Sequence, residues 1–308
     1  MIQPDVQIVL AERLAGGDRR FPFPRKLAQT FNVLIAERKA GVVGSRAIAS
    51  TLKMADFAIV NLEIPLTNSR TATQRKTPED VRARKQFILK ADPRHFSALT
   101  GAGIDAVSLG NNHGMDYGPA GLKEELGLLD GGRIAGLRFK VDLPNYGVFD
   151  EKRVFAVGPM PGPVNFRGVR IGVPICEDIW GPEPAECIAE TGGEILLVPN
   201  GSPYRRGVVD QRLSVAVARV KETGLPLIYL NQVGGQDELV FEGASFVLNA
   251  DTSLAVQLPP FAEAIVTTRW QRTAEGWRCE QGEIAHLLPQ ERSDYAACVL
   301  GLRDYVGK

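Results

Sequence analysis

The amino-acid sequence predicts an α/β protein, in which short buried strands alternate with helices. Strand-like segments occur at residues 57–60, 105–109 and 227–230, and segments with helical composition or spacing separate them. The chain has 308 residues, of which 44% are hydrophobic and 23% are charged. That composition is ordinary for a globular fold with a sizeable core, and the length suits one large domain or two ordinary ones.

Charge and cysteine usage narrow the function classes. Lys plus Arg and Asp plus Glu both total 36, so the formal net charge is zero, which argues against nucleic acid or an anionic membrane as partner. No apolar run has the length of a membrane span, and the first residues carry no secretory signal. The four cysteines show no C-x-x-C spacing, so we expect reduced thiols in a cytoplasmic protein. Three histidines are too few for a metal site built from several imidazoles.

The first half of the chain alternates short strands with helices. Composition and apolar runs predict strands at 6–11, 57–60 and 105–109, helices at 26–39, 45–53, 93–101 and 119–129, and an exposed polar loop at 69–85.

The second half carries clearer signals. A helix with apolar residues at Leu213, Val217 and Val220 should end at Gly224, because glycine is the commonest residue just past a helix end. The remaining predicted elements are strands at 137–140, 169–175, 194–198 and 227–230, a hairpin at 246–258 turning at 249–251, and helices at 184–191 and 294–306.

The most informative stretch is the run 169–175, which is apolar except for Arg170 and Gly172. It leads directly to Cys176, which is followed by two carboxylates at 177–178. A thiol at a strand end, on the lip of a sheet, is how α/β enzymes present a nucleophile. A buried structural cysteine is the alternative, since free cysteine is among the most buried residue types. This segment alone leaves both readings open.

The region from about 50 to 128 carries two further motifs, ADFAIVNLEIPLT from Ala55 and GNNHGMDYG from Gly110. Together they resemble the CapA-type metallophosphoesterases of capsule synthesis. The resemblance implies metal or phosphate ligands at Glu63, Asn111 and His113, with Asp116 nearby. The rest of that family's pattern is missing, so we expect no bound metal. The alternative is a structural role, in which Asn112 or Asp116 caps the helix predicted at Pro119.

From about 129 to 308 the sequence resembles the glutamine-hydrolysing domain of glutamine-dependent NAD synthetase, in the nitrilase superfamily. Four motifs occur in family order: LPNYG after Lys140, CEDIW at Cys176, NGSP at Asn200 and NQVGG at Asn231. The resemblance implies a four-layer α-β-β-α sandwich and hydrolysis of the glutamine side-chain amide through a cysteine thioester, with no cofactor. We expect residues 1–128 to be a CapA-like part and 129–308 a glutaminase part of one compact domain.

The resemblance also implies the roles of the central residues. Cys176 would be the nucleophile, and the Lys140 ammonium would favour its thiolate. That ammonium and the backbone N–H of Glu177 would bind the oxyanion of the tetrahedral intermediate. Tyr146 and Ser202 match positions that contact glutamine. A second carboxylate, Glu151, matches the residue that holds the lysine.

Three departures from the family pattern stand out. Where the family has a basic residue six positions beyond the serine, this chain has Val208, although Arg205 and Arg206 are close. No Ser-Gly-Gly phosphate loop is present, so this chain alone is not expected to make NAD. The N-terminal segment that carries the family's proton-transferring glutamate is missing as such.

Glu63 offers a substitute for that missing glutamate. It follows a predicted strand and precedes Lys140 and Cys176, which is the family's chain order, although its offset differs by one residue. We hypothesise that Glu63 lies near Cys176 and acts as its base. A solvent-facing loop glutamate is the alternative reading.

The alternatives for the whole chain are a metal-dependent phosphoesterase of CapA type and an inactive hybrid scaffold. The expected partner is glutamine, and association of identical chains is left open.

Overall fold

The structure is a computed structural model in which two compact units are described. The described residues are 8–12, 30–37, 59–61, 65–72, 78–82, 88, 90–95, 97, 101, 106–108, 116–117, 133–147, 149, 151–152, 156–166, 168–236 and 238–306. Unit 1 comprises residues 1–25 and 44–158, and unit 2 comprises residues 26–43 and 159–308.

Unit 1 contains a four-stranded sheet in the order β3-β4-β1-β5. Its strands are β1 (Ile8–Glu12), β3 (Ile59–Asn61), β4 (Ala106–Ser108) and β5 (Arg133–Arg138). Strand β1 is antiparallel to both β4 and β5, and β3 is parallel to β4. Because β5 ends at Arg138, Lys140 lies in the loop just beyond a sheet strand.

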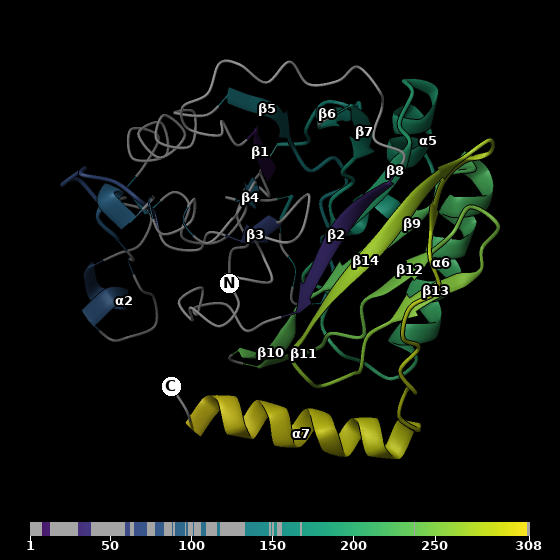
Figure 1. Cartoon of the computed structure of the whole chain (residues 1–308). Coiled ribbons are helices and arrows are strands. Elements are labelled where there is room, and N and C mark those ends of the chain that lie inside the picture. Colours follow the sequence, from purple (N-terminus) through teal and green to yellow (C-terminus); the bar gives the residue numbers. More distant parts are fainter. Residues whose placement is uncertain are drawn as a thin grey trace. The chain divides into compact units, whose positions relative to one another are not determined.

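Unit 2 is built around a six-stranded sheet in the order β13-β12-β9-β8-β7-β6 (Figure 1). Its strands are β6 (Val164–Phe166), β7 (Val169–Gly172), β8 (Ile195–Asn200), β9 (Leu227–Asn231), β12 (Phe246–Leu248) and β13 (Leu254–Gln257). The three central strands, β7, β8 and β9, are parallel, and the outer pairings are antiparallel. Loops that leave the carboxyl ends of parallel strands meet at one edge of a sheet, which is where α/β proteins place their sites.

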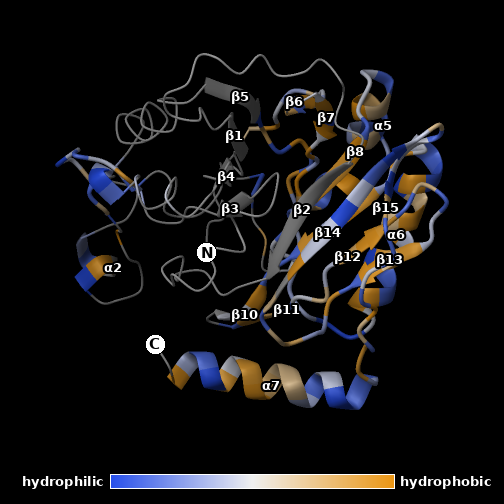
Figure 2. Ribbon diagram, in the orientation of Figure 1, coloured by the Kyte–Doolittle hydropathy of each residue, from blue (hydrophilic) through white to orange (hydrophobic). Residues whose placement is uncertain are grey.

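Two helices cover one face of this sheet, α5 (Glu183–Glu190) and α6 (Val208–Thr223). The core between them joins Ile188 of α5 and Val220 of α6 to the strand residues Leu196, Tyr229 and Phe246, all almost fully buried. Figure 2 shows apolar colouring over the sheet strands and mixed colouring on the helices that cover them. Burial of this apolar face is the main term that holds unit 2 together.

A second, three-stranded sheet of unit 2 has the order β15-β14-β2. Strand β14 (Ala264–Thr273) pairs with β15 (Gly276–Cys279) and, along its length, with β2 (Thr30–Glu37). The helix predicted at residues 26–39 is therefore wrong over β2. Val33 and Ile35 favour a strand, and an eight-residue ladder to a distant partner overrides local helical composition.

The remaining elements of unit 2 are a hairpin and the last helix. Strands β10 (Val233–Gln236) and β11 (Leu239–Glu242) pair antiparallel, and α7 (Gln290–Val306) packs against them (Figure 1). The backbone N–H of Gly235 donates to Asp304 of α7 at 2.7 Å. This bond and the close packing of Gly235 on Gly301 fix the helix to the hairpin.

Most local predictions are confirmed. Gly224 ends α6 in the left-handed conformation (φ +68°) and donates to Val220 O at 2.8 Å. The hairpin β12–β13 turns at the predicted residues, and α7 begins four residues before its predicted start at Asp294. Of the apolar residues on which α6 was predicted, Val220 is buried, whereas Leu213 is 36% exposed.

Other predictions are corrected or lie beyond the described residues. The loop predicted at 69–85 contains a short helix, α2 (Pro78–Arg82). The helix predicted at 93–101 begins with a 3-10 turn, η1 (Pro93–His95). The helices predicted at 45–53 and 119–129 lie outside the described residues. No helix among the residues that the structure describes is long and apolar enough to cross a membrane.

Gly235→Ala is expected to destabilise unit 2 by about 1–3 kcal/mol, because overpacking costs this much in a tight contact. A Cβ at this position would lie 2.9 Å from the Cα of Gly301 and 3.3 Å from the Cβ of Asp304. Urea unfolding followed by tryptophan fluorescence measures the loss. Gly162→Ala is the matched control, since its Cβ would have no neighbour closer than Thr191 Oγ1 at 3.7 Å. Equal stability of both variants would contradict the expectation.

Candidate active site

Three positions at the carboxyl edge of the parallel strands in unit 2 carry polar side chains. The loop after β7 carries Cys176, the loop after β8 carries Ser202, and Asn231 is the last residue of β9. Strands β8 and β9 are in register at their ends, where Asn200 pairs with Asn231. The edge of the sheet therefore gathers a thiol, a hydroxyl and two amides.

Cys176 opens a 3-10 helix, η2 (Cys176–Ile179), in a strained backbone conformation. Its φ is +51°, a left-handed value that side chains other than glycine rarely adopt. Such outliers concentrate at functional sites, where the surrounding structure holds them in place. The regular strand ends at Gly172 rather than at the predicted residue 175, because Pro174 has no N–H for the ladder.

Asp178 stabilises this turn through two hydrogen bonds to the backbone of Ile175. Its carboxylate accepts a hydrogen bond from the backbone N–H of Ile175 at 2.9 Å, and its own N–H donates to Ile175 O at 3.1 Å. The Asp178 side chain is buried, whereas Cys176 and Glu177 are half-buried. Asp178 therefore holds the backbone of the turn, while the Cys176 side chain is partly exposed.

The Ser202 loop is fixed by Asn231. The Asn231 Oδ1 atom accepts from the backbone N–H of Ser202 at 3.0 Å, and Nδ2 donates to Ser202 O at 3.1 Å. Asn231 is itself buried, and its own backbone N–H donates to Ser245 Oγ at 2.8 Å. A buried amide with both ends bonded is a rigid support for the loop.

The Tyr229 hydroxyl lies beneath these loops. The ring is buried and stacks on Phe246, with ring centroids 4.9 Å apart. Burial raises the pKa of this phenol, neighbouring Arg212 opposes that rise, and a negative charge on Cys176 adds to it. Interaction of this oxygen with the Ser202 side chain lowers the pKa in turn. The hydroxyl therefore lies close to both Cys176 and Ser202.

Unit 1, taken by itself, contains a buried ion pair. The Lys140 ammonium donates to both carboxylate oxygens of Glu151, at 2.9 and 2.8 Å, and both side chains are 4% exposed. The loop that holds the lysine is closed by two backbone bonds, from Gly158 N to Lys140 O at 2.9 Å and from Glu151 N to Pro144 O at 3.1 Å. A buried charge needs such a partner, because an unpaired one carries a large desolvation cost.

The other predicted site residues of unit 1 are placed less completely. Tyr146 is 54% exposed and meets Phe149 edge to face, with ring centroids 5.9 Å apart. Glu63, Asn111 and His113 lie outside the described residues. Asp116 is buried. Within the described ranges no three His, Cys, Asp or Glu side chains form a group that could hold a metal ion.

Val208, which stands where the resembled family has a basic residue, is buried as the first residue of α6. The two neighbouring arginines are engaged elsewhere. Arg205 donates to the Gln211 side chain, and Arg206 forms an ion pair with Asp294 of α7 at 2.7 Å.

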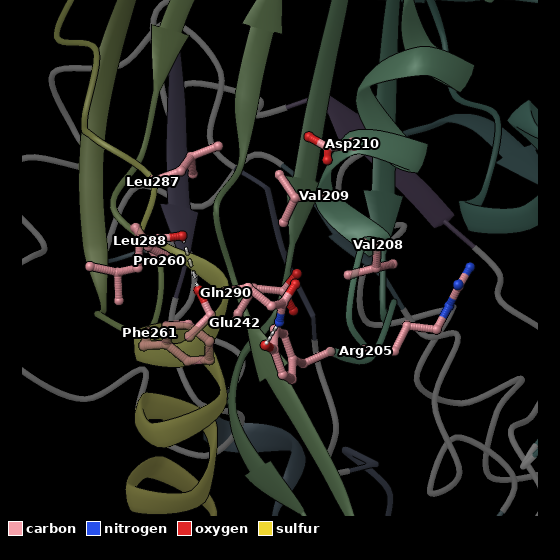
Figure 3. Close-up of a pocket in the computed structure, with 13 residues that line it drawn as sticks. Arg205, Val208, Val209, Asp210, Glu242, Pro260, Phe261, Leu287, Leu288 and Gln290 are labelled. Carbon is pink, nitrogen blue, oxygen red and sulfur yellow. Dashed lines mark hydrogen bonds between the residues drawn. The ribbon is translucent and has the colours of Figure 1, made fainter.

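Unit 2 also has a cavity of about 230 Å³ between the start of α6, residues 260–261 and the start of α7. Figure 3 shows Glu242 and Gln290 in the middle of its lining, with Phe261 and Leu288 to one side. Neither Cys176 nor Ser202 lines it. Burial raises the pKa of the Glu242 carboxyl, and the charge of neighbouring Arg212 opposes that rise. This cavity is separate from the thiol.

Sequence reasoning missed three residues of this arrangement. Asp178 stands in the CEDIW motif and Asn231 in the NQVGG motif, so each carried a signal by its position. Their supporting roles follow from hydrogen bonds that only the folded chain displays. Tyr229 gave no signal, because an aromatic residue in a buried strand is expected to be core.

Two family models match the chain. One described as carbon-nitrogen hydrolase matches residues 124–278, and one described as bacterial capsule synthesis protein PGA_cap matches residues 38–137. Both resemblances inferred from the motifs are thus confirmed. The two matches overlap at residues 124–137, around the junction predicted near residue 128.

Curated relatives support the resemblance to glutamine-dependent NAD synthetase. The chain is 47% identical over 224 residues to "Glutamine-dependent NAD(+) synthetase" of Rhodobacter capsulatus, a match that covers 73% of this chain and 40% of that protein. It is 35% identical over 241 residues to the protein of the same name from Xanthomonas campestris, covering 75% and 42%. The chain therefore spans about two fifths of the length of these relatives.

Solved structures share the fold. A glutamine-dependent NAD+ synthetase from Acinetobacter baumannii, solved with adenosine diphosphate, has a TM-score of 0.63 at 25% identity, covering 90% of this chain and 52% of that one. A carbon-nitrogen hydrolase from Helicobacter pylori has a TM-score of 0.52 at 18% identity, covering 89% and 95%. The predicted α/β class is confirmed as a fold of the nitrilase superfamily.

Proposed function

This chain belongs to the carbon-nitrogen hydrolase family, and we propose that it hydrolyses the side-chain amide of glutamine to glutamate and ammonia through a thioester on Cys176. The observation that carries the proposal is the strained left-handed Cys176 at the carboxyl edge of three parallel strands. Similarity to glutamine-dependent NAD+ synthetases supports glutamine as the substrate. The proposal concerns amide hydrolysis alone.

The same proposal includes the architecture and the role of the two sequence regions. Residues 1–128 and 129–308 would together form one four-layer α-β-β-α sandwich of the nitrilase type. The pairing of β2 with β14 supports this, because it joins a segment from the first region to the sheets of the second.

The reaction begins with attack of the Cys176 thiolate on the amide carbon of glutamine. The Lys140 ammonium, held by Glu151, favours the thiolate and stabilises the oxyanion together with the Glu177 backbone N–H. The C–N bond then breaks, the nitrogen accepts a proton and leaves as ammonia, and an acyl thioester remains. Water attacks the thioester, and glutamate is released with regeneration of the thiol.

The Ser202 loop and Tyr146 would contact the substrate. The Ser202 loop is rigidly supported by Asn231, so its groups can orient the substrate without further ordering. The exposed Tyr146 ring would pack on the substrate's aliphatic stem.

The direct test supplies L-glutamine to the purified chain and measures glutamate and ammonia, with L-asparagine as the comparison substrate. Glutamate and ammonia in equal amounts, with much less product from asparagine, are expected. Absence of ammonia release, together with metal-dependent hydrolysis of p-nitrophenyl phosphate, would overturn the proposal in favour of a phosphoesterase.

Glu63 is proposed as the base that takes the thiol proton and returns it to departing ammonia. Glu63→Gln is expected to lower kcat by about 100-fold or more, which is the usual contribution of general acid–base catalysis. The pH profile of kcat/KM should lose its acidic limb, because that limb would report ionisation of this carboxyl. Glu79→Gln, a change on the exposed helix α2, is the matched control. An unchanged pH profile in Glu63→Gln would remove the residue from the mechanism.

A further inference from the structure

Helix α6 carries two buried arginines on the face that packs against the sheet. Arg212 is 3% exposed and Arg219 is 6% exposed, although arginine is almost never fully buried unless paired. They are seven residues apart, which is two helical turns, so they lie on the same side of the helix with Ala216 between them. The two arginines therefore lie two helical turns apart on the buried face of α6.

Arg212 grips the Ser202 loop. Its Nε donates to Ser202 Oγ at 3.0 Å, and its second terminal nitrogen donates to Ser202 O at 2.7 Å and to Pro203 O at 3.2 Å. The remaining terminal nitrogen is paired with the carboxylate of Glu242. One planar fork thus fixes both the hydroxyl and the backbone of the loop.

Arg219 grips the turn that carries Cys176. One terminal nitrogen donates to Ile179 O at 3.1 Å and to Trp180 O at 3.3 Å, the carbonyls at the far end of η2. The other donates to Glu222 on the same helix at 2.7 Å. Carbonyls at the end of a helix have no partner within the helix, so the guanidinium supplies one.

The structure points to Arg212 and Arg219 as positioning residues, through which α6 holds the substrate loop and the nucleophile turn in one fixed arrangement. This inference rests on the proposed function for the roles of Ser202 and Cys176. Neither arginine touches the reacting atoms. Arg219 acts through the backbone that it anchors, and Arg212 acts through the backbone and the hydroxyl of Ser202.

The two anchors should fail in different ways. A loosened Ser202 loop loses the alignment that binds substrate, while the thiol stays in place. A loosened η2 lets Cys176 relax from its left-handed backbone toward commoner values, which moves the sulfur. A displacement of about 1 Å in a reacting group can cost on the order of 100-fold in rate.

The experiment compares Arg212→Lys with Arg219→Lys, which keep the charge but lose the planar fork. Arg212→Lys is expected to raise KM for glutamine about 10-fold or more, with little change in the rate at which iodoacetamide alkylates Cys176. Arg219→Lys is expected to lower kcat and the alkylation rate together by about 10- to 100-fold, with little change in KM. Mass spectrometry of the Cys176 peptide follows the alkylation.

Two controls isolate the anchors. Glu222→Gln alters the outer partner of Arg219 but leaves both carbonyl contacts, so it should keep wild-type alkylation. Arg278→Lys changes an exposed arginine that pairs with Asp251 and should alter nothing. Circular dichroism verifies folding, and Arg212→Gln or Arg219→Gln replaces a lysine variant that fails to fold.

The inference is overturned if both arginine variants change KM, kcat and alkylation in the same proportion, because that pattern is general loss of fold. It is also overturned if neither variant changes any of them. Alkylation of Cys176 needs no glutamine turnover. If the wild-type chain does not hydrolyse glutamine, the proposed function is refuted. If Arg219→Lys still slows alkylation of Cys176 in that case, the anchoring of the nucleophile turn holds nonetheless.

Discussion

Cys176→Ala is expected to lower glutamine hydrolysis by about 10⁴-fold or more, because removal of a nucleophile abolishes the covalent route and leaves only binding and electrostatic effects. The fold should be unaffected, since the side chain is half-buried and the Asp178 carboxylate holds the turn through its hydrogen bond from Ile175 N. Glutamate release measures the loss, and the melting temperature verifies the fold.

A chemical readout accompanies this variant. The wild-type chain should form an adduct with a glutamine-analogue electrophile at Cys176, with one label per chain, and Cys176→Ala should form none. Cys298→Ala is the matched control, because Cys298 is an exposed cysteine on α7 and should keep both activity and label. Glutamine hydrolysis that survives in Cys176→Ala would contradict the thioester mechanism.

The second large effect is expected at the buried pair in unit 1. Glu151→Gln leaves the Lys140 ammonium buried without its charged partner, and breaking a buried pair in this way costs about 3–5 kcal/mol. Urea unfolding measures the cost. Activity should fall as well, because the lysine loses the group that orients it.

A double variant separates stability from chemistry. Lys140→Met with Glu151→Leu replaces the whole pair by apolar side chains of similar size, and such replacements are often neutral or stabilising. We expect its stability to return to within about 1 kcal/mol of the wild type, while glutamine hydrolysis stays absent. If the double variant recovered activity, Lys140 would have no part in catalysis.

Local signals predicted much of the secondary structure for a physical reason. Gly224 ended α6 as expected, because only a residue that tolerates a positive φ suits that position. The hairpin around residues 249–251 followed from turn residues between two apolar runs. Local signals failed for residues 30–37, where pairing with β14 overrode helical composition.

The features of the candidate site also separate into those predicted from the sequence and those seen only in the folded chain. The sequence alone determined the α/β class, the family and the motif residues, because strand and helix periods, turn residues and short motifs are properties of neighbours along the chain. Only the tertiary structure decided that Cys176 is left-handed, that Asn231 supports Ser202, and that two arginines of α6 are buried. The reason is that backbone strain, burial and hydrogen bonds between distant residues arise from packing, which no single stretch of sequence encodes.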